Sequence, residues 1–263
     1  DFDGTVTDAE AEGTPFRRGY LEDVAVLAGL SFDVVEGLAA QFEAEVAADP
    51  QAFGWVYNGQ IVAPATVDPY LRMMPVARKI FDHAGAFLDE GDRTRLCDGI
   101  LYKYNYQKTL TAFRPNAFEA LRDLTGTATY VVTNSHTEPV REKIGQLDAG
   151  TGTLEWLIAR VHGRAKKYVI DDAFEDIAPE LSLPGLNRPV LLRRRLYHDV
   201  LRELLDRHGL NWSNLTVVGD IFELDLALPL MMGARVGLVV NAFKPRVIDF
   251  SPDADKLYIG SQE

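Results

Sequence analysis

The chain has 263 residues, a formal net charge of −12, one cysteine and 47% hydrophobic residues. The acidic balance argues against nucleic acid or an anionic membrane as the main partner, and one cysteine excludes a disulfide within the chain. There is no apolar run of about 18 residues and no visible secretion signal, so we expect a globular, cytoplasmic protein without a membrane span.

The first part of the chain has the spacing of helices. Apolar residues recur at intervals of three and four over residues 17–49, which predicts a helical region there. Prolines and the turn pair Asn58-Gly59 interrupt the pattern, and helical spacing resumes over residues 70–81 and 95–110. This stretch lacks strands that alternate with helices, so we interpret it as a separate helical domain.

After Pro115 the pattern changes to short apolar runs separated by helical segments. Four strands are predicted within residues 128–135, 156–161, 215–220 and 235–240, and four helices within 116–126, 138–147, 193–209 and 223–234. Such alternation is typical of parallel strands joined by right-handed crossovers. We therefore expect a doubly wound α/β core over residues 1–12 and 113–263, with the helical domain as an insert over residues 13–112.

Polar residues follow three of the predicted strands. Thr133-Asn134 follow the first, Lys167 lies just past the second, and Asp220 follows the third. Because the carboxyl ends of parallel strands meet at one edge of a sheet, we expect these side chains to converge. The opening segment, DFDGT, would join them if a strand came directly before it.

The aspartates of this predicted edge suggest a cation. Asp1 and Asp3 lie two residues apart with no basic residue between them, so their carboxylates would repel without one. Mg²⁺ prefers oxygen ligands, and Asp1, a carbonyl near Asp3, and Asp220 would supply them. Asp225, in the sequence GDIFELD, would ligate the ion or hold a bound water.

The segments DFDGT, VVTNS, GRAKKYVI and GDIFELD occur in the order of the motifs of the haloacid dehalogenase-like (HAD) superfamily, which the chain resembles. The resemblance covers residues 1–5 and about 114–240. It implies a Rossmann-like core, a helical cap of the C1 type, and a Mg²⁺-dependent phosphomonoester hydrolase. With an acidic residue at position 3, the chain resembles the phosphatases and phosphomutases of the superfamily rather than its dehalogenases.

The resemblance also implies a role for each matched residue. Asp1 would be the nucleophile that forms an aspartyl phosphate, and Asp3 the general acid and base. Thr133 would hold the phosphoryl group, with Gly4 and Asn134 as further phosphate-binding residues. The magnesium ligands would be Asp1, Asp3, Asp220 and Asp225.

The basic residue of the family has several candidates. GRAKKYVI is similar to the lysine-bearing segment of the cytosolic purine 5′-nucleotidases, which favours Lys167 and then Lys166. Arg195 or Arg194 is the alternative, at the start of the helix before the third predicted strand. The substrate is expected to be a nucleotide or another small phosphorylated metabolite.

Two alternatives remain for the function. A phosphotransferase or phosphomutase of the same superfamily would use the same residues, and a catalytically silent module would only bind phosphate. The nucleophile of the family follows a central strand, whereas this sequence opens at Asp1. We therefore expect the natural protein to extend beyond the sequence given. The residues predict no oligomeric state.

Overall fold

The computed structural model describes residues 1–65, 68–104, 110–240 and 257–258, and it shows a mixed α/β protein. The chain divides into two compact units. The first unit contains Asp1–Asp8 and the described residues from Phe113 onward. The second, helical unit contains the described residues of Ala9–Ala112. Within the described part of the chain, we find no helix with the length and apolar character needed to cross a membrane.

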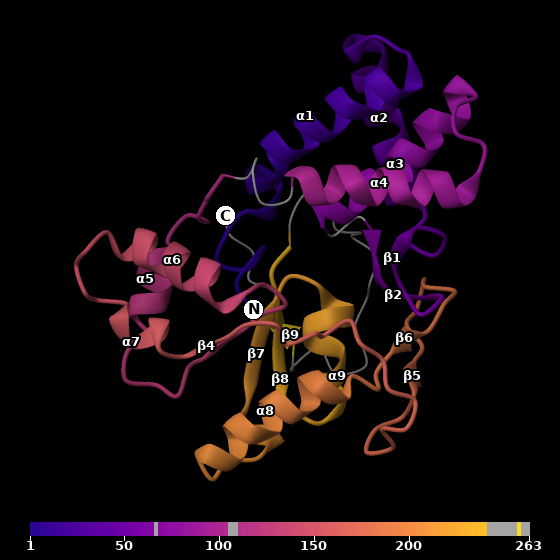
Figure 1. Cartoon of the computed structure of the whole chain (residues 1–263). Coiled ribbons are helices and arrows are strands. Elements are labelled where there is room, and N and C mark those ends of the chain that lie inside the picture. The colour runs from indigo at the N-terminus through magenta and orange to yellow at the C-terminus, as the bar shows by residue number, and fades with distance from the viewer. Residues whose placement is uncertain (66–67, 105–109, 241–256, 259–263) are drawn as a thin grey trace. The chain divides into compact units, whose positions relative to one another are not determined.

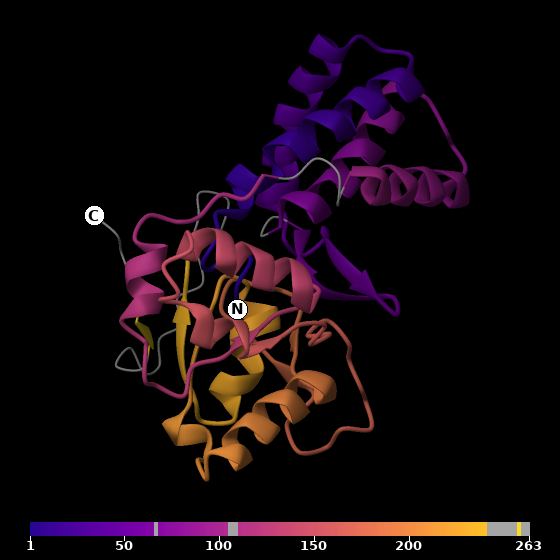
Figure 2. The same cartoon turned by 60° about the vertical axis from the view of Figure 1, so that its left-hand side comes forward.

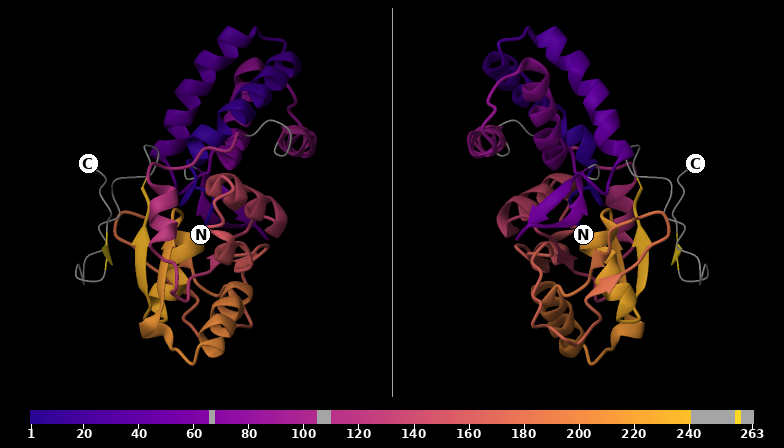
Figure 3. Two further views of the ribbon diagram at one scale, coloured as in Figure 1. Left: turned by 90° about the vertical axis from the view of Figure 1, so that its left-hand side faces the viewer. Right: turned by 90° about the vertical axis from the view of Figure 1, so that its right-hand side faces the viewer.

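The described part of the second unit consists mainly of helices (Figure 3). The helices are α1 (Ala9–Ala28), α2 (Phe32–Ala48), α3 (Pro69–Ala84) and α4 (Glu90–Tyr104). Helices α1, α2 and α3 pack against one another, and α4 packs on α1 and α3. Their apolar faces share one core that includes Phe16, Tyr20 and Phe81, all fully buried.

The helical region predicted over residues 17–49 is two helices. Gly29 has φ +67° and ends α1, and the Leu30 N–H donates to the Ala25 carbonyl at 3.0 Å. A glycine in the left-handed conformation is the commonest way to end a helix, and this glycine reverses the chain direction before α2 begins. The periodicity continues across the turn, so it could not reveal the break.

Helix α3 confirms the helix predicted over residues 70–81 and has a defined start and end. The Asp68 side chain accepts hydrogen bonds from the N–H groups of Tyr70 (2.7 Å) and Leu71 (3.2 Å). Gly85, with φ +64°, ends the helix. Residues 105–109, at the end of the next predicted helix, lie outside the described residues.

A hairpin in this unit was not predicted as strands. Strands β1 (Gly54–Tyr57) and β2 (Gln60–Pro64) pair antiparallel around Asn58-Gly59 (Figure 2). Both turn residues have positive φ, at 49° and 78°, as a two-residue hairpin turn of this twist requires. The turn pair was recognised in the sequence, but the flanking residues do not alternate strictly between apolar and polar.

The first unit carries short strands between helices (Figure 1). Its helices are α5 (Ala117–Arg122), α6 (Thr137–Asp148), α7 (Glu155–Ile158), α8 (Arg195–Arg207) and α9 (Ala227–Met231). Its strands are β3 (Val131–Val132), β4 (Val161–His162), β5 (Glu180–Leu181), β6 (Val190–Leu191), β7 (Thr216–Gly219), β8 (Arg235–Leu238) and β9 (Leu257–Tyr258). Strands β3 and β4 pair in parallel, as do β7, β8 and β9, whereas β5 and β6 pair antiparallel.

The described residues form these small sheets instead of the single continuous parallel sheet that we predicted. The N-terminal segment links two of them. The backbone nitrogen of Asp1 donates to the Val218 carbonyl of β7 at 2.7 Å, and the buried Phe2 packs with Val131 of β3. The paired segments of β3 and β4 are two residues long, which leaves few hydrogen bonds to define a wider sheet.

The strand predicted over residues 156–161 is wrong for most of its length. Helix α7 occupies Glu155–Ile158, and only Val161 and His162 form β4. A short apolar run is compatible with a buried helical turn as well as with a strand, so periodicity cannot decide between them. The end of the segment still pairs with β3, so the following residues leave the sheet at the expected edge.

A partly buried ion pair in the helical unit provides a test of its packing. Arg72 is 2% exposed, and its Nη1 and Nη2 donate to the two carboxylate oxygens of Glu10 at 2.9 and 2.6 Å. Arg72→Ala leaves a carboxylate without its cation and should lower the free energy of unfolding by about 3 kcal/mol. Arg18→Ala removes the exposed i,i+4 pair with Glu22 and should cost less than about 0.5 kcal/mol. Urea unfolding followed by circular dichroism measures both, and equal losses would contradict the prediction.

Candidate active site

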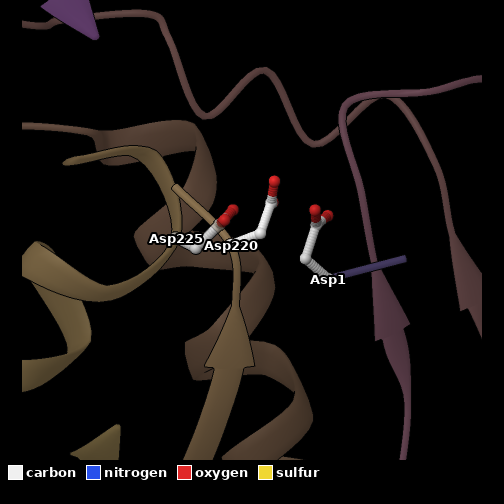
Figure 4. Close-up of side chains that lie close together, drawn as sticks. All are labelled: Asp1, Asp220 and Asp225. Carbon is white, nitrogen blue, oxygen red and sulfur yellow. The ribbon is translucent and has the colours of Figure 1, made fainter. Parts of the chain in front are cut away.

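Three aspartates from distant parts of the chain come together in the first unit (Figure 4). Asp1, Asp220 and Asp225 each place a carboxylate oxygen within 4.8 Å of the others. Asp220 directly follows β7, and Asp225 lies in the π-helical turn Phe222–Leu226 that comes next. Asp220 and Asp225 are 3% and 2% exposed, so their charges are held away from bulk water.

Two glycines allow the backbone to approach these carboxylates. Gly4 has φ +75°, and a Cβ added there would lie 2.1 Å from Oδ2 of Asp220. A Cβ on Gly219 would lie 2.4 Å from the Cβ of Asp225. Any larger residue at either position would have to displace an aspartate, which explains the glycines in DFDGT and in VVGD.

A lysine ammonium lies among the aspartates. Nζ of Lys167 lies 2.9 Å from Oδ1 of Asp1 and 2.8 Å from Oδ1 of Asp225, and the side chain is 1% exposed. Burial, the largest single influence, raises the pKa of the Asp225 carboxyl. Neighbouring positive charge, chiefly that of Lys167, and the hydrogen bonds from Lys167 and from the Ile221 N–H together outweigh it and keep that pKa below its usual value. Asp225 is therefore held ionised in a buried position.

The backbone around Lys167 runs beside the segment that follows β3. The Ala165 N–H donates to the Thr133 carbonyl at 2.9 Å, and the Lys167 N–H donates to Oδ1 of Asn134 at 2.7 Å. Thr133 is 2% exposed, and its Oγ1 accepts a hydrogen bond from the Ser135 N–H at 3.1 Å. The structure thus brings Asn134 to Lys167 directly and places Thr133 on the adjoining turn.

Asp3 stands apart from the three-carboxylate group. Its Oδ1 lies 2.8 Å from Nζ of Lys143 on α6, and its Oδ2 is buried without a hydrogen-bond partner among the described residues. The backbone carbonyl of Gly4, the next residue in the chain, accepts two hydrogen bonds from the Arg114 guanidinium, at 2.8 and 3.2 Å. Asp3 therefore has one oxygen fixed by a cation and one buried oxygen that accepts no hydrogen bond from the described residues.

The other candidate basic residues lie elsewhere. Lys166 is exposed, with φ +48°, and Arg195 is half exposed and faces Asp171 and Asp199 at 3.7 and 3.8 Å. Arg194 is fully buried, and its guanidinium donates to the carbonyls of Leu191 and Lys167. Burial lowers the pKa of Arg194 to about 10.

Two residues at the site were not singled out in the sequence. Lys143 contacts Asp3, and Tyr197 on α8 donates from its hydroxyl to the Asp225 carbonyl at 2.9 Å. Both lie within helices that were correctly predicted from the sequence. A helical pattern carries no information about which distant residue a side chain will reach.

The donor set of the three aspartates suits a hard divalent cation. Carboxylate oxygens are the ligands that Mg²⁺ and Ca²⁺ prefer, and the cluster includes no histidine or cysteine that would favour zinc. The buried carboxylates carry more negative charge than Lys167 alone neutralises. Asp1, Asp220 and Asp225 could therefore hold such an ion.

Comparisons with known proteins give limited information. No family model matches the chain, and no curated protein sequence matches it significantly. Among solved structures, the chain is similar to a HAD phosphatase from Thermococcus onnurineus, with 14% identity and a TM-score of 0.41 over 94% of this chain and 88% of that one. A TM-score of this size is too low to support a conclusion about the fold or the activity of this chain.

The close approach of Gly4 to Asp220 gives a prediction for cation binding. Gly4→Ala should weaken divalent-cation binding by at least about tenfold, because the new methyl group must push Asp220 out of the cluster. Gly126→Ala is the matched control: its φ of +86° imposes similar backbone strain, but no atom lies within 4 Å of the new Cβ. Titration calorimetry with Mg²⁺ measures both, and equal affinities would contradict the prediction.

Proposed function

We propose that the protein is a HAD-like, Mg²⁺-dependent phosphomonoesterase that acts through an aspartyl phosphate on Asp1. The observation that carries this proposal is the buried Lys167 ammonium, which lies between Asp1 and Asp225 with Asp220 beside them. A cluster of carboxylates and one cation at the end of a parallel strand is the arrangement expected for phosphoryl transfer. On this proposal the first unit is the Rossmann-like core, and the helical unit selects the substrate as a C1-type cap.

In the first step, a carboxylate oxygen of Asp1 attacks phosphorus, and the bond from phosphorus to the leaving oxygen breaks. Asp3 gives its proton to that oxygen, so the product leaves as an alcohol. The buried Oδ2 of Asp3 supports this role, because a carboxyl oxygen without a protein partner can carry and release a proton.

In the second step, water attacks the aspartyl phosphate, and Asp3 accepts a proton from that water. The bond between phosphorus and the Asp1 oxygen breaks, which releases inorganic phosphate and restores the carboxylate. Lys143 positions Asp3 in both steps, since its ammonium fixes one oxygen of the carboxyl group.

Positive charge and hydrogen-bond donors stabilise the transferring group. Lys167 supplies a compact ammonium, and Thr133 supplies a hydroxyl whose oxygen already accepts from the Ser135 N–H, which leaves its proton to donate. Mg²⁺ held by Asp1, Asp220 and Asp225 would supply further positive charge for the phosphoryl oxygens. We propose a small phosphorylated metabolite as the substrate, with a nucleotide as the first choice because GRAKKYVI is similar to the 5′-nucleotidase segment.

Hydrolysis of para-nitrophenyl phosphate tests the proposed activity. The protein should release nitrophenol in the presence of Mg²⁺ and lose this activity when the ion is chelated. Asp1→Asn should lower the rate by at least about a thousandfold, because the amide is no longer a nucleophile. Acid-quenched wild-type protein should carry phosphate on Asp1, as measured by mass spectrometry of the N-terminal peptide.

Three outcomes separate the alternatives. Turnover with release of inorganic phosphate supports the hydrolase. Phosphate that moves to an alcohol acceptor or to a second position on a sugar bisphosphate, without free phosphate, favours a phosphotransferase or phosphomutase. Binding of inorganic phosphate with neither turnover nor a phosphoprotein indicates the silent binding module and overturns the proposal.

Three of the four candidate basic residues, Lys167, Lys166 and Arg195, can be distinguished by a matched series of substitutions. Lys167→Met should lower the rate by at least about a hundredfold, because it removes the ammonium that contacts Asp1 and Asp225. Lys166→Met and Arg195→Met are the controls, because each also replaces a long basic side chain. Lys166 is exposed to solvent and Arg195 faces Asp171, so both variants should keep a rate close to that of the wild-type protein. A large loss in either control would contradict the assignment of Lys167.

A further inference from the structure

Tyr197, in the first turn of α8, contacts both members of the ion pair between Lys167 and Asp225. Its hydroxyl donates to the backbone carbonyl of Asp225 at 2.9 Å. Nζ of Lys167 lies 5.3 Å from the centre of its ring, within the range of a cation–π interaction. The side chain of Tyr197 is 1% exposed. Burial is the largest of several influences on the pKa of its hydroxyl and raises that pKa, so the group remains a neutral donor.

The ammonium of Lys167 is therefore surrounded on three sides. The carboxylates of Asp1 and Asp225 lie at 2.9 and 2.8 Å, and the Tyr197 ring covers a further side. A lysine side chain has four rotatable bonds and loses substantial conformational entropy when it is fixed. The ring lies against the ammonium without adding a further charge to the site.

The residue before α8 fixes the backbone of the same lysine. Nη1 of Arg194 donates to the Lys167 carbonyl at 2.5 Å, while Asn134 accepts from the Lys167 N–H at 2.7 Å. The peptide groups on both sides of Lys167 thus have partners from different segments. Arg194 thus holds the main chain of Lys167, and Tyr197 contacts its side chain.

We propose that Tyr197 is a positioning residue that sets the location of the Lys167 ammonium and of the Asp225 carboxylate within the site. This inference rests on the proposed function for its catalytic consequence, but the position of the ammonium can be measured without any assay of activity. The hydroxyl acts on Asp225 through its carbonyl, and the ring acts on Lys167, so the two contributions can be removed separately.

The first experiment measures how accessible Lys167 is. Competitive acetylation followed by mass spectrometry compares the labelling of Lys167 with that of Lys79, which lies in the other unit and serves as an internal reference. Tyr197→Leu should raise the relative labelling of Lys167 at least about tenfold, because the ring no longer covers the ammonium. The control is Leu204→Ala, which truncates a buried side chain about two turns farther along α8.

The second experiment removes only a hydroxyl. Tyr197→Phe keeps the ring but loses the hydrogen bond to Asp225, and it should weaken Mg²⁺ binding about tenfold and lower kcat for para-nitrophenyl phosphate with little change in KM. Tyr20→Phe is the matched control, since it removes a buried hydrogen bond from a tyrosine hydroxyl to the Cys97 carbonyl (3.1 Å) in the helical unit. It should leave the affinity and the kinetics unchanged.

Equal labelling of Lys167 in Tyr197→Leu and Leu204→Ala would overturn the proposed role of the ring. Equal Mg²⁺ affinity and kinetics in Tyr197→Phe and Tyr20→Phe would overturn the role of the hydroxyl. If the wild-type protein neither binds Mg²⁺ nor hydrolyses the phosphate ester, the proposed function fails, and the labelling experiment alone decides the positioning role of Tyr197.

Discussion

Mutual repulsion among Asp1, Asp220 and Asp225 is the constraint that the architecture of the first unit has to satisfy. Their oxygens lie within 4.8 Å of one another, and at an effective dielectric constant near 20 each pair of charges repels by about 3 kcal/mol. Lys167 offsets part of this by two ion pairs shorter than 3 Å. The remaining negative charge explains why a second, dissociable cation fits the chemistry of the site.

Such a site needs rigid surroundings, because a lysine with freedom to turn away would release the carboxylates from their partner. The segment that carries Lys167 is bonded to the turn after β3 on one side and to the start of α8 on the other. Gly4 and Gly219 permit the close backbone contacts that a side chain would prevent. The precision of the centre thus comes from backbone packing and hydrogen bonds as much as from the charged groups themselves.

The sequence indicated the members of this centre better than it indicated the sheet. Asp1, Lys167 and Asp220 were expected to converge because residues that follow parallel strands share an edge, and this reasoning needs only the order of the elements. The extent of the strands depends on pairing between distant segments, which local periodicity does not record, so the run over residues 156–161 was misread. Lys143 and Tyr197 were missed for a related reason: the reach of a helical side chain depends on how its helix is rotated and docked.

The ion pairs of Lys167 span very different lengths of chain, with a sequence separation of 166 from Asp1 and of 58 from Asp225. Contacts of such long sequence separation close long loops, which costs conformational entropy before the contacts stabilise the fold. A partly folded species in which these loops are open would have scattered aspartates and no cation site. An ion that binds only the completed centre stabilises the native state by mass action. The concentration of that ion would therefore also influence the fraction of molecules that reach and keep the native fold.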